Sequence, residues 1–235
     1  MDTISSLSVI ALAALVHASF QLSISVLTLL SGHAIGSKKP YRRVVGLTTS
    51  FVSGAGIMTL LLIAFVALLF NNLYGRSVPL AVWAIACGLL FGVGVAVWLF
   101  YYRRSPGTSL WLPRGMARYL SDRTKLTKNP AESFSLGLTS VVSELIFIAA
   151  PVIVSGLALT NLAPGMQLVG VLLYAVISLL GLVAVWALIG SGHSLSVIQK
   201  WRETNKGFLQ FVGGGGLIVL SFFVYVSQII GTTRL

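Results

Sequence analysis

The stretch SVVSELIFIAAP (140–151) places one carboxylate, that of Glu144, in the longest charge-poor part of the chain. Glu144 is the only charged residue between Glu132 and Lys200. The apolar window around it, 133–159, exceeds the roughly 20 residues that a helix needs to cross the hydrocarbon core of a bilayer. This window therefore predicts a membrane-spanning helix, in which a carboxylate is costly and seldom accidental.

The composition of the whole chain indicates the same environment. Hydrophobic residues make up 56% of the sequence and charged residues only 9%, and the mean hydropathy is +0.94. A soluble domain carries about 25% charged residues, far more than this chain. The composition therefore predicts an all-α, polytopic membrane protein whose immediate partner is the lipid bilayer.

Six charge-free windows are each long enough to cross the bilayer as a helix. They lie at about 5–32, 45–70, 79–102, 133–159, 167–191 and 208–230. The connections after the second and fourth windows, 71–79 and 160–166, are short and rich in Asn, Gly and Pro, as turns are. The chain accordingly divides into a first three-helix unit (1–102), a basic cytoplasmic connection (103–130) and a second three-helix unit (131–235).

The positive charges are concentrated in alternate connections. Of the 16 Lys and Arg residues, 14 lie in the connections after the first, third and fifth windows, and Arg76 and Arg234 are the exceptions. Cytoplasmic connections are enriched in Lys and Arg, so we expect these three to be cytoplasmic and both termini to be outside. Membrane topology thus explains the net charge of +11 without a nucleic acid partner. The expected location is the plasma (inner) membrane of a bacterium or archaeon.

The third connection contains an amphipathic segment, LWLPRGMARYLSDRTKL (110–126). Its apolar and charged residues fall on opposite faces of a helix: Leu112, Met116, Tyr119 and Leu120 against Arg114, Arg118, Asp122 and Lys125. This pattern predicts a short helix lying on the inner membrane surface. Asn129, Pro130 and Glu132 then form a helix start, with the asparagine as cap and the glutamate closing a capping box. Helix chemistry explains Glu132 but not Glu144.

The two halves of the chain are similar in sequence. ASFQLSISVLTLLSG (18–32) aligns without gaps with VSELIFIAAPVIVSG (142–156). GLLFGVGVAVWLFYY (88–102) aligns loosely with FVGGGGLIVLSFFVY (211–225). Because each half holds three spans, the two halves would be inverted relative to each other, a common plan of secondary transporters. We therefore expect six transmembrane helices arranged as two inverted repeats of three.

With the basic segment KKPYRRVVGLTTSFVSGAG (38–56) leading into the second span, this architecture resembles the superfamily of lysine exporters and the membrane thiol-electron carriers CcdA and DsbD. The resemblance implies a transport-like core whose first and fourth spans carry the working residues. The electron carriers have one cysteine in each of those two spans. The only cysteine here, Cys87, falls in the third span, so the chain lacks that redox pair.

Glu144 and His17 are the main candidate functional residues. Each lies roughly 11 or 12 residues into its span, from opposite sides, so both reach the bilayer midplane, where inverted-repeat transporters bind substrate. His17, Gln21, Ser25 and Thr28 have the spacing of one helical face. We expect a pathway for substrate or protons that is formed by Glu144, His17, Gln21, Thr139, Ser140, Ser143, Pro151, Tyr174 and Ser178.

The pattern favours transport over enzymatic activity. One Glu and one His are too few ligands for a metal site, and no phosphate loop or nucleophile–base pair is present, so we expect no cofactor and no catalytic residue. The first hypothesis is a proton-coupled transporter or exporter of a small solute. The alternatives are a non-transporting membrane subunit or scaffold, in which Glu144 makes a structural hydrogen bond, and a redox membrane protein that depends on Cys87. A homo-oligomer and a membrane protein partner both remain open.

Overall fold

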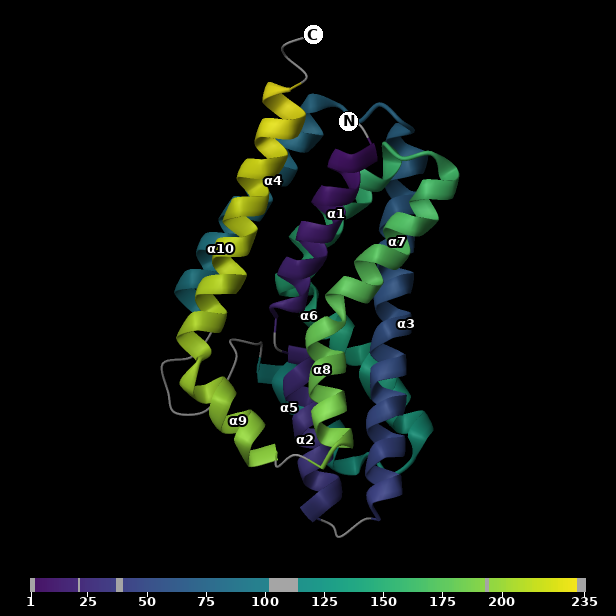
Figure 1. Cartoon of the computed structure of the whole chain (residues 1–235), viewed down its shortest axis with the longest axis vertical. Coiled ribbons are helices and arrows are strands. Elements are labelled where there is room, and N and C mark those ends of the chain that lie inside the picture. Colours follow the sequence, from purple (N-terminus) through teal and green to yellow (C-terminus); the bar gives the residue numbers. More distant parts are fainter. Residues whose placement is uncertain (1–2, 21, 37–39, 102–113, 193–194, 232–235) are drawn as a thin grey trace.

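The computed structural model of the chain describes residues 3–20, 22–36, 40–101, 114–192 and 195–231. These residues form ten α-helices and a final π-helix, with no strand among them. In chain order the helices are α1 (Thr3–Ala18), α2 (Leu22–Gly36), α3 (Tyr41–Tyr74), α4 (Leu80–Phe100), α5 (Arg114–Leu126), α6 (Pro130–Thr160), α7 (Pro164–Ser178), α8 (Leu180–Gly190), α9 (Leu195–Thr204), α10 (Lys206–Val224) and η1 (Tyr225–Ile230). Figure 1 shows one elongated bundle, in which α1 begins and η1 ends at the same end.

The prediction of an all-helical protein is confirmed for the described residues, and several of their helices are long and apolar enough to span a membrane. Four segments are long and apolar enough to cross a bilayer singly: α3, α4, α6, and α10 together with η1. The first and fifth predicted spans are each divided into two helices. The axes of α1 and α2 differ by 41°, and those of α7 and α8 by 48°. The described helices therefore provide four candidate spans, or six if each bent pair crosses the membrane as one unit.

The helices beside the basic connections lie toward one end of the bundle. In Figure 1, α5, α9 and the ends of α2 and α8 lie in the half opposite the start of α1 and the end of η1. This arrangement is required if the first, third and fifth connections share one side of a membrane. That this side is the cytoplasm stays a prediction from the charges.

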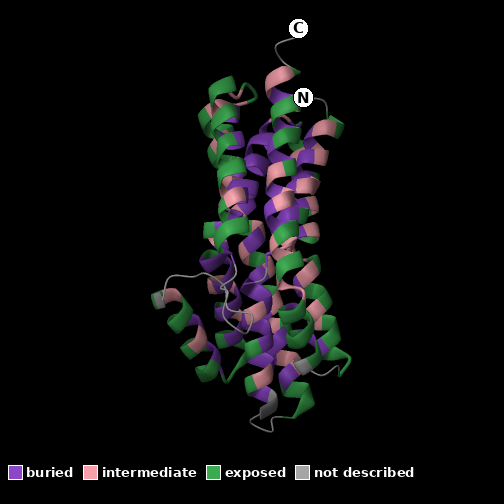
Figure 2. Ribbon diagram, turned by 90° about the vertical axis from the view of Figure 1, so that its left-hand side faces the viewer, coloured by how far each residue is buried: buried purple, intermediate pink, exposed green. Residues whose placement is uncertain are grey.

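Helix α6 is the central element of the bundle. In its apolar window 72% of the residues are buried, against 22% in α3 and 33% in α4. It contacts α1, α2, α3, α4, α5 and α7. Figure 2 shows buried residues gathered inside the bundle and exposed residues on its outer faces. Apolar side chains such as Phe65 and Leu61 are on those outer faces, as expected where lipid is the solvent. Glu144 therefore lies near the middle of the most enclosed helix.

Two glycines bring the backbones of α3 and α6 into contact. A Cβ atom at Gly54 would overlap the carbonyl oxygen of Phe134, and a Cβ atom at Gly137 would overlap that of Phe51. Small residues allow such close approach of helices in a membrane. Gly137 precedes Glu144 by about two helical turns, so this contact holds α6 in place near the carboxylate.

The predicted amphipathic helix is confirmed as α5, which packs against α2 and α6. Leu120 is buried and Met116 packs against the core, but Tyr119 is 47% exposed. Tyr119 therefore does not share their buried face, and Leu112 lies outside the described residues. Whether α5 lies on a membrane surface stays a prediction.

The predicted start of α6 is also confirmed. The Glu132 N–H donates to Asn129 Oδ1 at 2.9 Å, as expected for an asparagine cap. The Glu132 carboxylate reaches back to the N–H of Lys128 at 2.6 Å and to Asn129 Nδ2 at 2.8 Å. This resembles a capping box, except that the glutamate accepts from the backbone N–H of Lys128, the residue before the cap, and not from that of the cap itself.

The two predicted three-helix units form a single bundle, because α3 packs on α6, α4 on α10 and α1 on α7. The helix breaks do not fall at equivalent places in the two units. The first span of the first unit is broken after α1, whereas α6, its predicted counterpart, is continuous from Pro130 to Thr160. The break in the second unit falls instead between α7 and α8. The inverted repeat stays a prediction.

We expect Gly54→Ala to lower the free energy of unfolding by about 1–3 kcal/mol, because the added methyl group forces the backbones of α3 and α6 apart. Gly46→Ala on the same helix is the matched control, since a Cβ there meets no atom within 4 Å. It should be neutral or stabilising, because alanine favours helix over glycine. Unfolding of the purified protein in detergent, followed by circular dichroism, measures both. Equal effects of the two variants would contradict the close contact.

Candidate functional site

The first predicted span breaks where Glu144 meets it. Helix α1 ends at Ala18 and α2 begins at Leu22, with neither Gly nor Pro between them. The Leu22 N–H donates to Glu144 Oε1 at 3.1 Å, and the Ser23 hydroxyl donates to Oε2 at 2.8 Å. The first N–H groups of a helix lack partners within that helix, and its N-terminus attracts negative charge. Glu144 therefore caps α2 from a different helix.

This cap is enclosed by the bundle. Glu144 and Ser23 are 3% and 8% exposed, respectively. The Ser23 hydroxyl also lies 3.3 Å from the Ser140 hydroxyl, which donates to the Gly137 carbonyl oxygen at 2.8 Å. A buried polar group is costly unless it is hydrogen-bonded, and here the carboxylate accepts from the Leu22 N–H and the Ser23 hydroxyl, while the Ser140 hydroxyl donates to its own helix.

His17 connects the last turn of α1 to α7. Its Nδ1 atom lies 3.0 Å from the hydroxyl of Tyr174, and the two ring centroids are 5.7 Å apart. Both side chains are buried. The structure thus brings together two residues predicted for the pathway, which are 157 positions apart in the sequence.

The second break lies beside the first. Helix α7 ends at Ser178, and α8 begins at Leu180. A Cβ atom at Gly181, in the first turn of α8, would lie 3.1 Å from the carbonyl oxygen of Ala18, the last residue of α1. The end of α1 and the start of α8 are therefore in contact, and the glycine allows the two backbones to approach closely.

A small cavity lies between the two breaks. Its volume is about 20 Å³, which is room for one water molecule. The lining residues from the first span are His17, Ala18, Phe20, Ser23 and Ile24, and those from the fifth predicted span are Ser178, Leu179 and Leu182. Glu144 of α6 and Thr59 of α3 complete its polar wall. Glu144 and His17 thus line one cavity, although they form no hydrogen bond with each other among the described contacts.

The other predicted residues differ in their relation to the cavity, which Ser178 lines. Ser140 and Tyr174 are bonded to residues of the cavity, as described above. The hydroxyls of Thr139 and Ser143 donate to carbonyl oxygens of α6 itself, at Ser135 and Thr139. Pro151 is buried within α6 and does not line the cavity. Gln21 lies outside the described residues.

One sequence-based expectation is wrong. His17, Ser25 and Thr28 do not share the face of a continuous helix, because the span breaks between Ala18 and Leu22. Their spacing is helical only if residues 17–28 form one helix. The break separates His17, which faces α7, from Ser25, which faces α9.

Two residues of this region were not predicted from the sequence. Ser23, which bonds Glu144, is one of many serines in the spans and carries no distinguishing local signal. Arg202 of α9 is 2% exposed and donates to the Ser25 hydroxyl at 2.6 Å. The sequence places Arg202 in a basic connection, but its spacing of four from the buried Ile198 is a helical signal that could have identified a packed face.

Comparisons with known proteins add no relative. No family model matches the chain, and no curated protein or solved structure matches it either. The described residues also contain no group of three His, Cys, Asp or Glu side chains that could hold a metal ion. The polar groups of the site are a carboxylate, a histidine, a phenol and several hydroxyls.

The hydrogen bond between Ser23 and Glu144 can be measured by a double-mutant cycle. We expect Ser23→Ala and Glu144→Gln to show a coupling energy of about 1 kcal/mol in unfolding experiments in detergent, because hydrogen bonds between membrane helices are of this size. The matched control pairs Ser23→Ala with Glu132→Gln, a substitution at the exposed start of the same helix. That pair should show no coupling. Additive effects in both cycles would mean that Glu144 does not cap α2 in solution.

Proposed function

We propose that this chain is a secondary transporter or exporter of a small solute, coupled to protons through Glu144. The observation that carries the proposal is the carboxylate of Glu144 bonded to the start of α2, where two broken helices meet. Broken helices at mid-membrane are typical of transporter binding sites, because their free ends offer polar groups without extra side chains. The resemblance to lysine exporters supports the same class of function.

The protonation state of Glu144 would control the break. The ionised carboxylate accepts from the Leu22 N–H and the Ser23 hydroxyl, and its charge is favoured at the N-terminus of α2. A protonated carboxyl group loses that charge and carries a donor in place of one acceptor. Protonation therefore weakens the hold of α6 on α2 and favours movement of α2 relative to α1.

A solute can enter only after such a movement. The cavity between the breaks holds about one water molecule, which is too small for a metabolite. We therefore interpret the structure as a closed state. The solute pathway would open when the end of α1 separates from the start of α8. His17 and Tyr174, bonded to each other at this place, would receive the polar groups of the solute or relay the proton.

The redox alternative has little support. Its lone thiol, Cys87, is buried in α4 and does not line the cavity. A dithiol mechanism would require a second thiol from another protein. The scaffold alternative requires that Glu144 has a structural role alone, and the flux experiment below separates it from transport.

The proposal predicts a solute-dependent proton flux that needs Glu144. In liposomes that contain the purified protein and a pH-sensitive dye, wild-type protein should move protons on addition of the transported solute, and Glu144→Gln should abolish the flux. Cationic amino acids are the first solutes to test, given the resemblance to lysine exporters. Glu132→Gln is the matched control, since glutamine also suits a capping box, and it should keep the wild-type flux.

The outcomes separate the hypotheses. Equal flux in wild type and Glu144→Gln would overturn the coupling role. Absence of flux for every solute class, with folded protein and a stoichiometric membrane protein partner on purification, would favour the scaffold.

Opening at the break should be detectable with a thiol. In a Cys87→Ser background, Ser178→Cys places a single cysteine in the cavity wall. We expect a membrane-impermeant maleimide to label it slowly at high pH and faster as the pH falls, because protonation of Glu144 releases α2. When Glu144→Gln is added to this variant, the effect of Glu144 protonation on labelling should disappear. The labelling rate should then change with pH only as much as the reactivity of a thiol changes. Gly165→Cys, at an exposed position where a Cβ meets no atom, corrects for that reactivity.

A further inference from the structure

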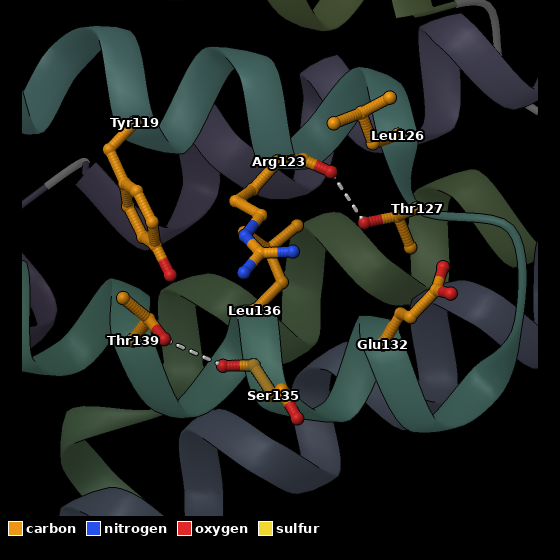
Figure 3. A pocket seen from close by; sticks show the side chains of 8 residues that line it. All are labelled: Tyr119, Arg123, Leu126, Thr127, Glu132, Ser135, Leu136 and Thr139. Atoms are coloured by element: carbon orange, nitrogen blue, oxygen red, sulfur yellow. Dashed lines mark hydrogen bonds between the residues drawn. The ribbon is translucent and has the colours of Figure 1, made fainter.

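A second and larger pocket lies between α5 and the start of α6. Its volume is about 260 Å³. Figure 3 shows the side chains that line it, with Tyr119 and Arg123 reaching down from α5 and with Ser135, Leu136 and Thr139 on α6. The pocket shares no lining residue with the cavity at Glu144. None of the transport chemistry described above uses it.

Arg123 supplies a positive charge in this pocket. Its guanidinium lies over the ring of Tyr119, 5.6 Å from the ring centroid, which orients the planar group toward α6. Glu132 is the one carboxylate in the lining, and its oxygens accept from the Lys128 N–H and from Asn129 Nδ2. These hydrogen bonds hold the Glu132 carboxylate at the helix cap, while its negative charge remains part of the lining.

The remaining polar atoms of the pocket suit an anion. Ser135 and Tyr119 contribute hydroxyl groups, which can donate to phosphate oxygens, whereas the Thr139 hydroxyl already donates to the Ser135 carbonyl oxygen at 2.9 Å. A planar guanidinium with several donors is the usual partner of phosphate in proteins. The surrounding surface is also basic, because Arg118, Lys125 and Lys128 are exposed around the same end of the bundle.

The pocket also lies where the predicted fourth span begins, which is the level of the membrane surface in the predicted topology. The apolar span begins within the first turn of α6, directly beside Ser135. Leu126 and Tyr119 line the pocket and are 62% and 47% exposed, so apolar and aromatic groups sit next to the charge. Aromatic residues with basic neighbours are typical of the interface between headgroups and acyl chains. A lipid can place its acyl chains against the apolar side of the pocket, whereas a soluble anion makes no such contact.

We propose that this pocket binds the phosphate of an anionic phospholipid of the inner leaflet, with Arg123 as the principal contact. The pocket volume of about 260 Å³ lies just below the roughly 300 Å³ at which pockets for drug-sized ligands begin, which suits a small group such as a lipid headgroup. The basic surface of α5 then recruits anionic lipid from the leaflet, and Arg123 with the hydroxyls of Tyr119 and Ser135 selects its phosphate.

Lipid-dependent thermal stability of the full chain tests the assignment. Purified protein in a neutral detergent is titrated with phosphatidylglycerol, with phosphatidylcholine and with inorganic phosphate. We expect phosphatidylglycerol to raise the unfolding temperature, and the other two to leave it unchanged. Arg123→Gln should weaken the apparent affinity roughly tenfold or more, as expected for loss of a charge-assisted contact. Arg118→Gln, the same change on the same helix outside the pocket, should weaken the apparent affinity much less than Arg123→Gln, because it removes only part of the surrounding basic surface.

Several results would overturn the proposal. Equal weakening by Arg118→Gln would mean that the lipid responds to net charge and not to the pocket. An equal effect of inorganic phosphate would assign the pocket to a soluble anion, and an equal effect of phosphatidylcholine would remove the requirement for anionic lipid. If Arg123→Gln does not fold, Ser135→Ala with Tyr119→Phe removes the two available hydroxyls instead and should weaken binding of phosphatidylglycerol. No response of wild-type protein to phosphatidylglycerol also rules the site out.

Discussion

The structure depends on one hydrogen-bonded group, the Glu144 carboxylate at the start of α2. A helix that is interrupted inside a membrane leaves N–H groups without water to bind, and each costs several kcal/mol unless another part of the protein satisfies it. Glu144 accepts from the Leu22 N–H and from the neighbouring Ser23 hydroxyl, and both come from a segment more than 120 residues away in the chain. The break in the first span thus leaves N–H and hydroxyl donors at the start of α2, and the carboxylate in the fourth span accepts hydrogen bonds from them.

The second break is tied to the first by contacts of a different kind. Gly181 allows α8 to approach the end of α1, while the His17–Tyr174 hydrogen bond joins α1 to α7 on the other side of that break. Helix α6 provides the fixed reference, because its backbone touches α3 at Gly137. Movement of one half-helix therefore has to be accommodated by the other, which is the mechanical requirement for coupling a proton to a solute.

Much of this fold could be predicted from the sequence, because hydropathy and charge report the solvent of each segment. The apolar windows, the start of α6 at Asn129 and the importance of Glu144 follow from those properties. The breaks could not be predicted, since residues 19–21 contain no Gly or Pro, and single polar residues such as Ser19 and Gln21 also occur inside unbroken spans. Their cause is a tertiary partner distant in sequence. The burial of Arg202 was missed for a related reason: charge counting places it in a connection, which is correct, but does not show that its side chain is buried against Ser25.

The energies involved explain why such a residue suits coupling. A carboxylate at the centre of a membrane helix costs about 2.5–3.5 kcal/mol by insertion scales. Each hydrogen bond between membrane helices contributes about 1 kcal/mol, and Glu144 accepts two of them. The cost and the gain are of similar size, so in the proposed mechanism neither the ionised, capped state nor a protonated, released state would be strongly favoured. A carboxylate in water would lack the cap, and a carboxylate in a strong ion pair would be held in one state. A carboxylate bonded to a neutral helix end lies between these limits, and a modest change in proton or solute concentration is then enough to shift its population.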